Sequence, residues 1–267
     1  FMKSFPFYMV NAFGIGPQSG NPAGVCILDE WLSTKELQGM AQQLNLPETA
    51  FVIPAKNETW SIRWFSVIKE IELCGHATLA AAHCIFEHGY KNESNQLSFR
   101  SKSGLLNSRK HEDGTIEILL PTIPLSAGIL SANLVEGLGA YPAGVWMGNN
   151  YLCLFDSSEN LKSLQPDFPT LLSLKGGQGI IATAVDDSGE YDFISRYFAP
   201  GIGINEDHAT GSAHCMLVPF WSKKLGKVKL FAQQASPRGG RFWCEDLNEF
   251  VSLRGYADLF LSGELTF

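Results

Sequence analysis

CGHATLAAAHC at residues 74–84 has a near-copy, DHATGSAHC at residues 207–215, in the second half of the chain. Each run contains His-Ala-Thr, a few small residues and then Ala-His-Cys. Three explanations compete for this echo: a metal site built from both runs, the trace of a gene duplication, or chance. The spacing of the ligand-type side chains and the sequence around each run discriminate between them.

The spacing within the two runs argues against a metal site. Zinc ligands on one helix need a separation of three or four residues to share a face. His83–Cys84 and His214–Cys215 are adjacent pairs, so their side chains would point about 100° apart on a helix. Cys74 and His76 could chelate an ion at a turn, but no second pair with that spacing completes the site. We therefore expect no metal.

Composition excludes several classes of protein. The chain has 267 residues, of which 45% are hydrophobic and 18% charged, as is ordinary for a globular protein with one or two cores. A net charge of −7 and scattered Lys and Arg residues argue against nucleic-acid binding. No run approaches 18 consecutive apolar residues, and the beginning lacks a signal-peptide pattern. We expect a cytoplasmic protein without a membrane span or disulfides, and with mostly buried cysteines.

The order of predicted elements supports a duplication. IRWFS (62–66) matches SRYFA (195–199), and shortly after each match a glycine, Gly75 or Gly211, opens a helix of small residues. We place the boundary at the proline-containing segment 121–128, which gives halves of 1–121 and 122–267. Ala and Gly permit close approach of backbone on all sides, so such a helix fits inside a curved sheet.

Local signals predict the shorter elements. Ser33 and Glu36 form a capping box for a helix, and Asp-Gly at 113–114 predicts a hairpin turn. The expected elements are helices at 33–45, 76–89 (ending at Gly89) and 210–226 (ending at Gly226), strands at 7–13, 25–28, 46–55, 60–65, 151–155, 179–185 and 191–200, and loops at 14–24 and 201–207.

The two glycines also suggest a binding function. The first N–H groups of a helix have no partner within the helix, and such an N-terminus attracts a carboxylate or phosphate. Helices beginning at Gly75 and Gly211 could present both N-termini to one acidic substrate. The alternative is that both glycines only permit tight turns.

Four motifs, in the same order, resemble the phenazine-biosynthesis isomerase (PhzF-like) family of the diaminopimelate-epimerase superfamily. They are GNPAGV (20–25), NLPETAFV (45–52), ELCGHATLAAAH (72–83) and NEDHATGSAHC (205–215). The resemblance implies an α+β fold of two pseudo-symmetric halves, each a β-barrel around a central helix, with the active site between them. It also implies that the last strand returns to the first half, and that the protein forms a homodimer.

The resemblance assigns roles to individual residues. It implies a cofactor-independent isomerase that acts on a small anionic metabolite, with Glu48 as the catalytic carboxylate. The implied catalytic residues are Glu48, His76 and Asp207, and the implied substrate-binding residues are Asn21, Cys74, Gly75, Thr210, Gly211 and Ser212.

The differences between the halves bear on the mechanism. Epimerases of this superfamily use one thiol from each half. Here Cys74 would be the first thiol, but Thr210 occupies the equivalent position in the second half. The position that would hold a second acid, opposite Glu48, falls near Gln178. One acid–base residue suits a proton shift on one face of the substrate. Two alternatives stay open: an epimerase or racemase that uses Cys74, and a non-catalytic binder of small anionic metabolites.

Overall fold

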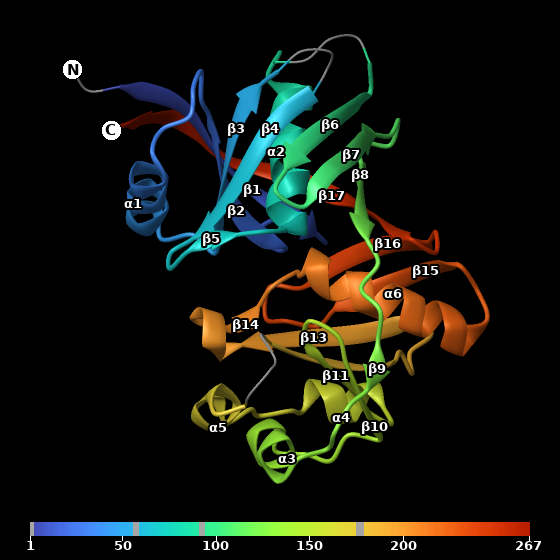
Figure 1. Cartoon of the computed structure of the whole chain (residues 1–267). Helices are drawn as coiled ribbons and strands as arrows, with labels where there is room; N and C mark the ends of the chain where they lie inside the picture. The colour runs from blue at the N-terminus through green and yellow to red at the C-terminus, as the bar shows by residue number, and fades with distance from the viewer. Residues whose placement is uncertain (1–2, 56–58, 91–93, 175–178) are drawn as a thin grey trace. The chain divides into compact units, whose positions relative to one another are not determined.

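The computed structural model describes residues 3–55, 59–90, 94–174 and 179–267 (Figure 1). The chain divides into two compact units. The N-terminal unit comprises Phe1–Leu120 and Leu253–Phe267, and the C-terminal unit comprises Pro121–Ser252. The end of the chain therefore packs with its beginning.

A closed β-barrel forms the N-terminal unit. The strands pair in the ring β1–β2–β3–β4–β6–β7–β8–β17–β1, with β5 at the edge of β4. The β2/β3 and β4/β6 pairs are parallel. The bounds are β1 (Ser4–Gly14), β2 (Asn21–Ile27), β3 (Glu48–Pro54), β4 (Thr59–Ser66), β5 (Glu70–Ile71), β6 (Gln96–Ser101), β7 (Gly104–Lys110), β8 (Ile116–Pro121) and β17 (Phe250–Thr266).

Helix α2 (Gly75–Glu87) is the central helix of this barrel, and it packs against β1, β2, β3 and β7. Every residue from Gly75 to Ala82 is buried. A helix that is apolar all round is stable only when it is enclosed, and its alanines let the strands approach closely. The predicted helix is thus confirmed, although His88 is its C-cap and Gly89 follows with φ +75°.

Helix α1 (Thr34–Leu44) carries the predicted capping box. The Ser33 hydroxyl accepts a hydrogen bond from the Glu36 N–H at 3.3 Å, and the Glu36 carboxylate accepts one from the Ser33 N–H at 2.8 Å. Two orphan donors are satisfied in this way. The apolar face of the helix, including Leu37 and Met40, is buried.

The C-terminal unit repeats this order of strands. Its strands pair in the order β9–β10–β11–β12–β13–β15–β16, with β14 beside β13. The β11/β12 and β13/β15 pairs are parallel, like β2/β3 and β4/β6. The bounds are β9 (Ser126–Ala127), β10 (Gly144–Met147), β11 (Tyr151–Leu154), β12 (Ile180–Val185), β13 (Phe193–Ala199), β14 (Ile204–Asp207), β15 (Lys229–Gln234) and β16 (Gly240–Asp246).

The helices of this unit include the counterpart of α2. Helix α6 (Gly211–Leu225) begins at the predicted glycine and ends at Gly226, whose φ of +69° closes the helix in the left-handed region. The remaining helices are short: α3 (Ala132–Leu138), α4 (Ser158–Lys162), α5 (Phe168–Leu172) and the 3-10 turn η1 (Pro200–Ile202).

A pair of matching ion pairs shows the repeat at atomic detail. Arg63 of β4 binds Glu70 through two bonds, of 2.8 and 2.9 Å. Arg196 of β13 binds Glu206 through two bonds of the same lengths. The strand registers agree as well, because Phe65 pairs with Glu70 and Phe198 with Glu206. The predicted pseudo-symmetric halves, built on IRWFS and SRYFA, are therefore confirmed.

Two predicted loops are partly wrong. Residues 21–24 belong to β2, which pairs with both β1 and β3, and residues 204–207 form β14. In both places backbone pairing with neighbouring strands overrides the low strand propensity of Gly, Pro and Asn. The hairpin turn at Asp113–Gly114 is confirmed. All six cysteines are buried and free.

A helix needs about 20 consecutive, mostly apolar residues to cross a lipid bilayer. In the described part of the chain, no helix is both long enough and apolar enough to cross a membrane.

Candidate active site

Glu48 is the first residue of β3, and its side chain is buried rather than displayed on a surface loop. It pairs with Ala23 of β2 and Ser66 of β4, and only 6% of its surface is exposed. A carboxylate in such a place needs a charged or hydrogen-bonding partner. The start of helix α2 supplies that partner.

Helix α2 begins beside Glu48 with Cys74 as its N-cap. The Cys74 side chain makes no capping hydrogen bond, and the first turn contains no acidic residue. The Cys74 carbonyl accepts hydrogen bonds from both the N–H and the hydroxyl of Thr78. The N–H groups at Gly75 and His76 precede the first intrahelical bond, so this terminus retains the positive potential that favours an anion.

Four side chains meet at this terminus. His76 Nε2 lies 3.1 Å from Glu48 Oε2. On the other side of the ring, His76 Nδ1 lies 3.2 Å from Asn21 Nδ2 and 3.6 Å from Cys74 Sγ. The structure therefore brings together the predicted residues Asn21, Glu48, Cys74 and His76, with Gly75 between the last two.

The Glu48–His76 contact is an ion pair of unusual form. Its distance is that of a hydrogen bond, but the ring N–H does not point at the oxygen. Among the described residues, neither Glu48 Oε2 nor His76 Nε2 therefore has a well-aligned hydrogen-bond partner. Two buried polar atoms in this condition are costly to stability. Such a cost is typical of sites where a ligand or a moving proton supplies the missing partner.

Opposing effects set the pKa of the His76 imidazole. Burial pushes this pKa down, whereas the neighbouring Cys74 and Glu48 push it up and prevail, so that it lies well above 6.5. Burial raises the pKa of the Cys74 thiol, and Glu48 adds to the rise, while His76 offsets it only in part. The two shifts have the same direction: each favours the protonated form, of the His76 imidazole and of the Cys74 thiol respectively.

The start of α6 in the C-terminal unit has different chemistry. Thr210 is its N-cap, and the Thr210 hydroxyl donates to Asp207 Oδ2 at 2.5 Å. Gln234 accepts the Thr210 N–H at 2.7 Å and donates to the Asp207 carbonyl at 2.8 Å. The predicted residues Asp207, Thr210 and Gly211 are buried here, and Ser212 is half-buried.

Gln234 is a residue that the sequence analysis missed. It lies at the end of β15, next to another glutamine, and no spacing signal connects it to the 207–211 loop. Its fully buried amide fixes the N-cap of α6 through three hydrogen bonds, the third being to the Thr210 hydroxyl at 3.0 Å. We infer that it positions this terminus.

The strand registers locate the counterpart of Glu48. Glu48 precedes Thr49, which pairs with Phe65; Gly179 precedes Ile180, which pairs with Phe198. Phe65 and Phe198 are equivalent in the repeat, so Gly179 is the counterpart. The predicted place of this counterpart, near Gln178, agrees with Gly179 to within one residue; Gln178 itself lies outside the described residues.

Gly179 has no room for a side chain. A Cβ atom there would lie 2.5 Å from the phenol oxygen of Tyr197, which donates a hydrogen bond to Asn150 at 3.1 Å. Real Cβ atoms essentially never come this close to another heavy atom. The C-terminal unit therefore has no carboxylate at the position of Glu48, and the tyrosine ring fills the space.

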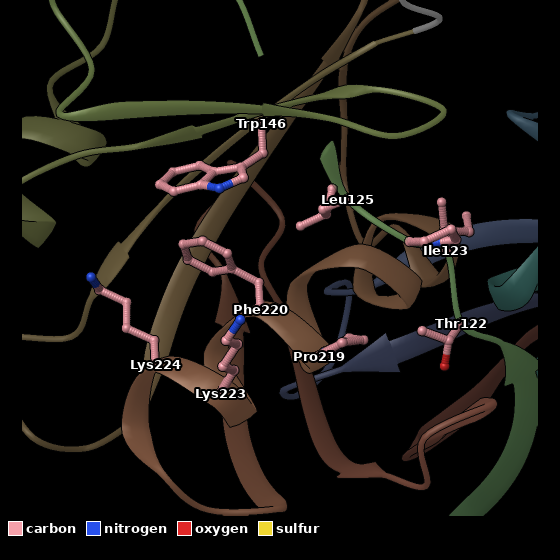
Figure 2. Close-up of a pocket in the computed structure, with 9 residues that line it drawn as sticks. Thr122, Ile123, Leu125, Trp146, Pro219, Phe220, Lys223 and Lys224 are labelled. Atoms are coloured by element: carbon pink, nitrogen blue, oxygen red, sulfur yellow. The ribbon is translucent and has the colours of Figure 1, made fainter. Parts of the chain in front are cut away.

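The C-terminal unit also has a groove of about 520 Å³ (Figure 2). Its walls are the segment Thr122–Leu125, Trp146 of β10 and one side of α6, where Phe220 and Trp146 form an edge-to-face pair. Lys223 and Lys224 lie on the same side of α6. None of the lining residues is a carboxylate, thiol or imidazole, so the groove lacks the acid–base groups found around Glu48.

Solved structures share the fold of the whole chain. A hydroxyproline epimerase from Agrobacterium vitis has a TM-score of 0.68 at 9% identity, covering 99% of this chain and 93% of that one, which shows the fold alone. A crystal structure of a phenazine biosynthesis protein of the PhzF family from Enterococcus faecalis has a TM-score of 0.92 at 38% identity. It covers 98% of this chain and 99% of that one. The fold is thus epimerase-like.

Sequence comparison narrows this class to a family. The PhzC–PhzF family, described as phenazine biosynthesis-like protein, matches residues 10–263. A protein of Pseudomonas aeruginosa named as an uncharacterized isomerase is 42% identical over 260 residues, which is 97% of each chain. The chain belongs to the PhzC–PhzF family and is an isomerase, as the four sequence motifs indicate.

Proposed function

We propose that the chain is a cofactor-independent isomerase that moves a proton on a small, carboxylate-bearing metabolite, with Glu48 as general acid and base. The observation that carries this proposal is the buried contact of 3.1 Å between Glu48 and His76 at the start of α2. Carboxylate and imidazole groups that share a proton in a desolvated site are suited to proton transfer from carbon.

The reaction needs one residue to act twice. A Glu48 oxygen takes the proton from a substrate carbon, and the electron pair of the broken C–H bond moves along the carbon skeleton. The same carboxyl group then returns the proton to a second carbon, so atoms and charge balance. His76 holds Glu48 in place, and the first N–H groups of α2 bind a substrate carboxylate.

The C-terminal unit offers no second base at the positions equivalent to Glu48 and Cys74. Gly179 stands at the position of Glu48, and Thr210 stands at the position of Cys74. A threonine hydroxyl does not act as a base near neutral pH. A proton removed and returned by one residue stays on one face of the substrate. The contribution of Asp207, Thr210, Gly211 and Ser212 to substrate binding stays a prediction from the sequence.

The epimerase alternative, with Cys74 as base, is less well supported. A thiol must be ionised to remove a proton, and the burial of Cys74 together with the nearby Glu48 raises its pKa. His76, whose Nδ1 lies 3.6 Å from the sulfur, lowers the pKa of this thiol but offsets the effect of burial only in part. The position of Cys74 instead suggests a contribution to the shape of the site.

A screen for solvent exchange distinguishes these functions. Metabolites that raise the thermal unfolding temperature would each be incubated with the protein in D₂O and followed by proton NMR. We expect at least one small carboxylate to exchange a C–H proton. We also expect the Cys74→Ser variant to exchange it within about tenfold of the wild-type rate.

Other outcomes of the screen would overturn the proposal. A loss of exchange greater than about a hundredfold in Cys74→Ser, with wild-type circular dichroism, would favour the thiol as base. Ligands that stabilise the wild-type protein without any exchange would identify a non-catalytic binder of anionic metabolites.

A further inference from the structure

The cluster of Glu48, Cys74 and His76 has the composition of a transition-metal site. One carboxylate oxygen, the thiol sulfur and one imidazole nitrogen all lie within 4.8 Å of one another, and all three residues are buried. In the part of the chain that the structure describes, it is the one group of three such ligands at this spacing. The His83–Cys84 and His214–Cys215 pairs do not take part.

The ligand atoms are within about an ångström of the spacing in a zinc site. Tetrahedral Zn²⁺ binds nitrogen, oxygen and sulfur at about 2.0–2.3 Å, which separates neighbouring ligand atoms by about 3.5 Å. The Cys74 Sγ–His76 Nδ1 distance is 3.6 Å, and the His76 Nε2–Glu48 Oε2 distance is 3.1 Å. These two distances use opposite nitrogens of the His76 ring, whereas one ion binds a single ring nitrogen. With one atom taken from each residue, the three ligand atoms lie within 4.8 Å of one another, so they must close by about an ångström to bind the ion.

A further observation points to a ligand. Among the described residues, Glu48 Oε2 and His76 Nε2 have no well-aligned hydrogen-bond partner although both are buried. Asn21 lies against the ring through its amide nitrogen, 3.2 Å from Nδ1, and so helps to hold its orientation. These features distinguish the cluster from a chance grouping of side chains that could bind a metal.

We propose that Glu48, Cys74 and His76 form an inhibitory site for Zn²⁺ or a similar thiophilic divalent cation. Binding displaces the thiol proton and the proton shared by His76 and Glu48, both of which go to solvent. The metal then occupies the groups that would move the substrate proton. Metal binding is independent of the proposed function, whereas inhibition rests on it.

Cobalt spectroscopy tests the binding directly. Co²⁺ replaces Zn²⁺ in such sites, and a Co²⁺–thiolate bond gives an intense charge-transfer absorption in the near ultraviolet. We expect metal-free full-length protein to bind one Co²⁺ with this band, and Zn²⁺ to displace it. The band should disappear in Cys74→Ser and persist in Cys84→Ser, whose thiol is buried in the same helix outside the cluster.

Calorimetry and exchange measurements complete the test. We expect Zn²⁺ affinity to fall at least about tenfold in Cys74→Ser, and Zn²⁺ to stop proton exchange until a chelator is added. Two results would overturn the inference: no Co²⁺–thiolate band in the wild-type protein, or an unchanged band in Cys74→Ser. The first result needs no variant, so it holds even if Cys74→Ser folds poorly. If the metal binds but Glu48→Gln still exchanges protons, the site stands and the proposed function fails.

Discussion

Replacing Glu48 with Gln is expected to lower proton exchange into the substrate by about 10²–10⁴-fold, the usual contribution of a general acid–base residue. The amide keeps the shape of the side chain but cannot take a proton from carbon. Glu48 is buried at the start of β3, and among the described residues it is the carboxylate that forms an ion pair with His76. The measurement is the rate of deuterium incorporation by NMR.

A matched control makes this result specific. Glu117 lies on β8 of the same unit, partly exposed and bound to His111 at 3.0 Å. Glu117→Gln should leave the exchange rate unchanged. If Glu48→Gln retained exchange within tenfold of wild type, Glu48 would not be the base.

The second large effect concerns acid stability. His214 in α6 is completely buried, stacks on Phe242 at 3.8 Å and contacts the Thr210 carbonyl through Nδ1 at 2.8 Å. Burial lowers the pKa of His214 from 6.5 to about 4. Between these two pH values His214 is protonated in the unfolded chain but neutral in the folded chain. The free energy of unfolding therefore falls as the pH drops from about 6.5 towards 4.

The size of this effect follows from the two pKa values. At 1.36 kcal/mol per pH unit, the loss of unfolding free energy from His214 reaches about 3 kcal/mol once the pH is below 4. His214→Gln should flatten the fall between pH 6.5 and 4, even if it lowers stability at neutral pH. Denaturant unfolding at a series of pH values measures this slope.

The control for this prediction is His111, which is partly exposed on the N-terminal unit. His111→Gln should keep the wild-type slope. An unchanged slope in His214→Gln would show that another group governs the acid response.

Much of the fold could be predicted because local signals agreed with the tertiary structure. The capping box at Ser33 and the hairpin at Gly114 depend only on neighbouring residues, and both formed. The repeat could be recognised at Arg63 and Arg196 because both arginines have the same structural role. Each forms an ion pair with a glutamate on the adjacent short strand, Glu70 or Glu206. The first part of β2 and all of β14 were missed, because they owe their extended form to strands far away in the sequence.

The candidate site was less accessible from sequence. Glu48 directly follows a proline at the very start of a strand, and without the family motif its sequence context is that of an exposed carboxylate. Its burial depends on β2 and β4. Gln234 could not be connected to Asp207, because their contact joins two elements that share no spacing pattern. The position opposite Glu48 could be assigned to Gly179 only from the strand register.

The central claim is that a single residue, Glu48, removes and returns the same proton. Its most direct test uses the substrate found by the exchange screen, carrying deuterium at the carbon that loses its proton, in a single turnover in H₂O. We predict that part of the deuterium reappears at the second carbon, on the face from which it left. Complete loss of the label, with a solvent proton added on the opposite face, would contradict the account.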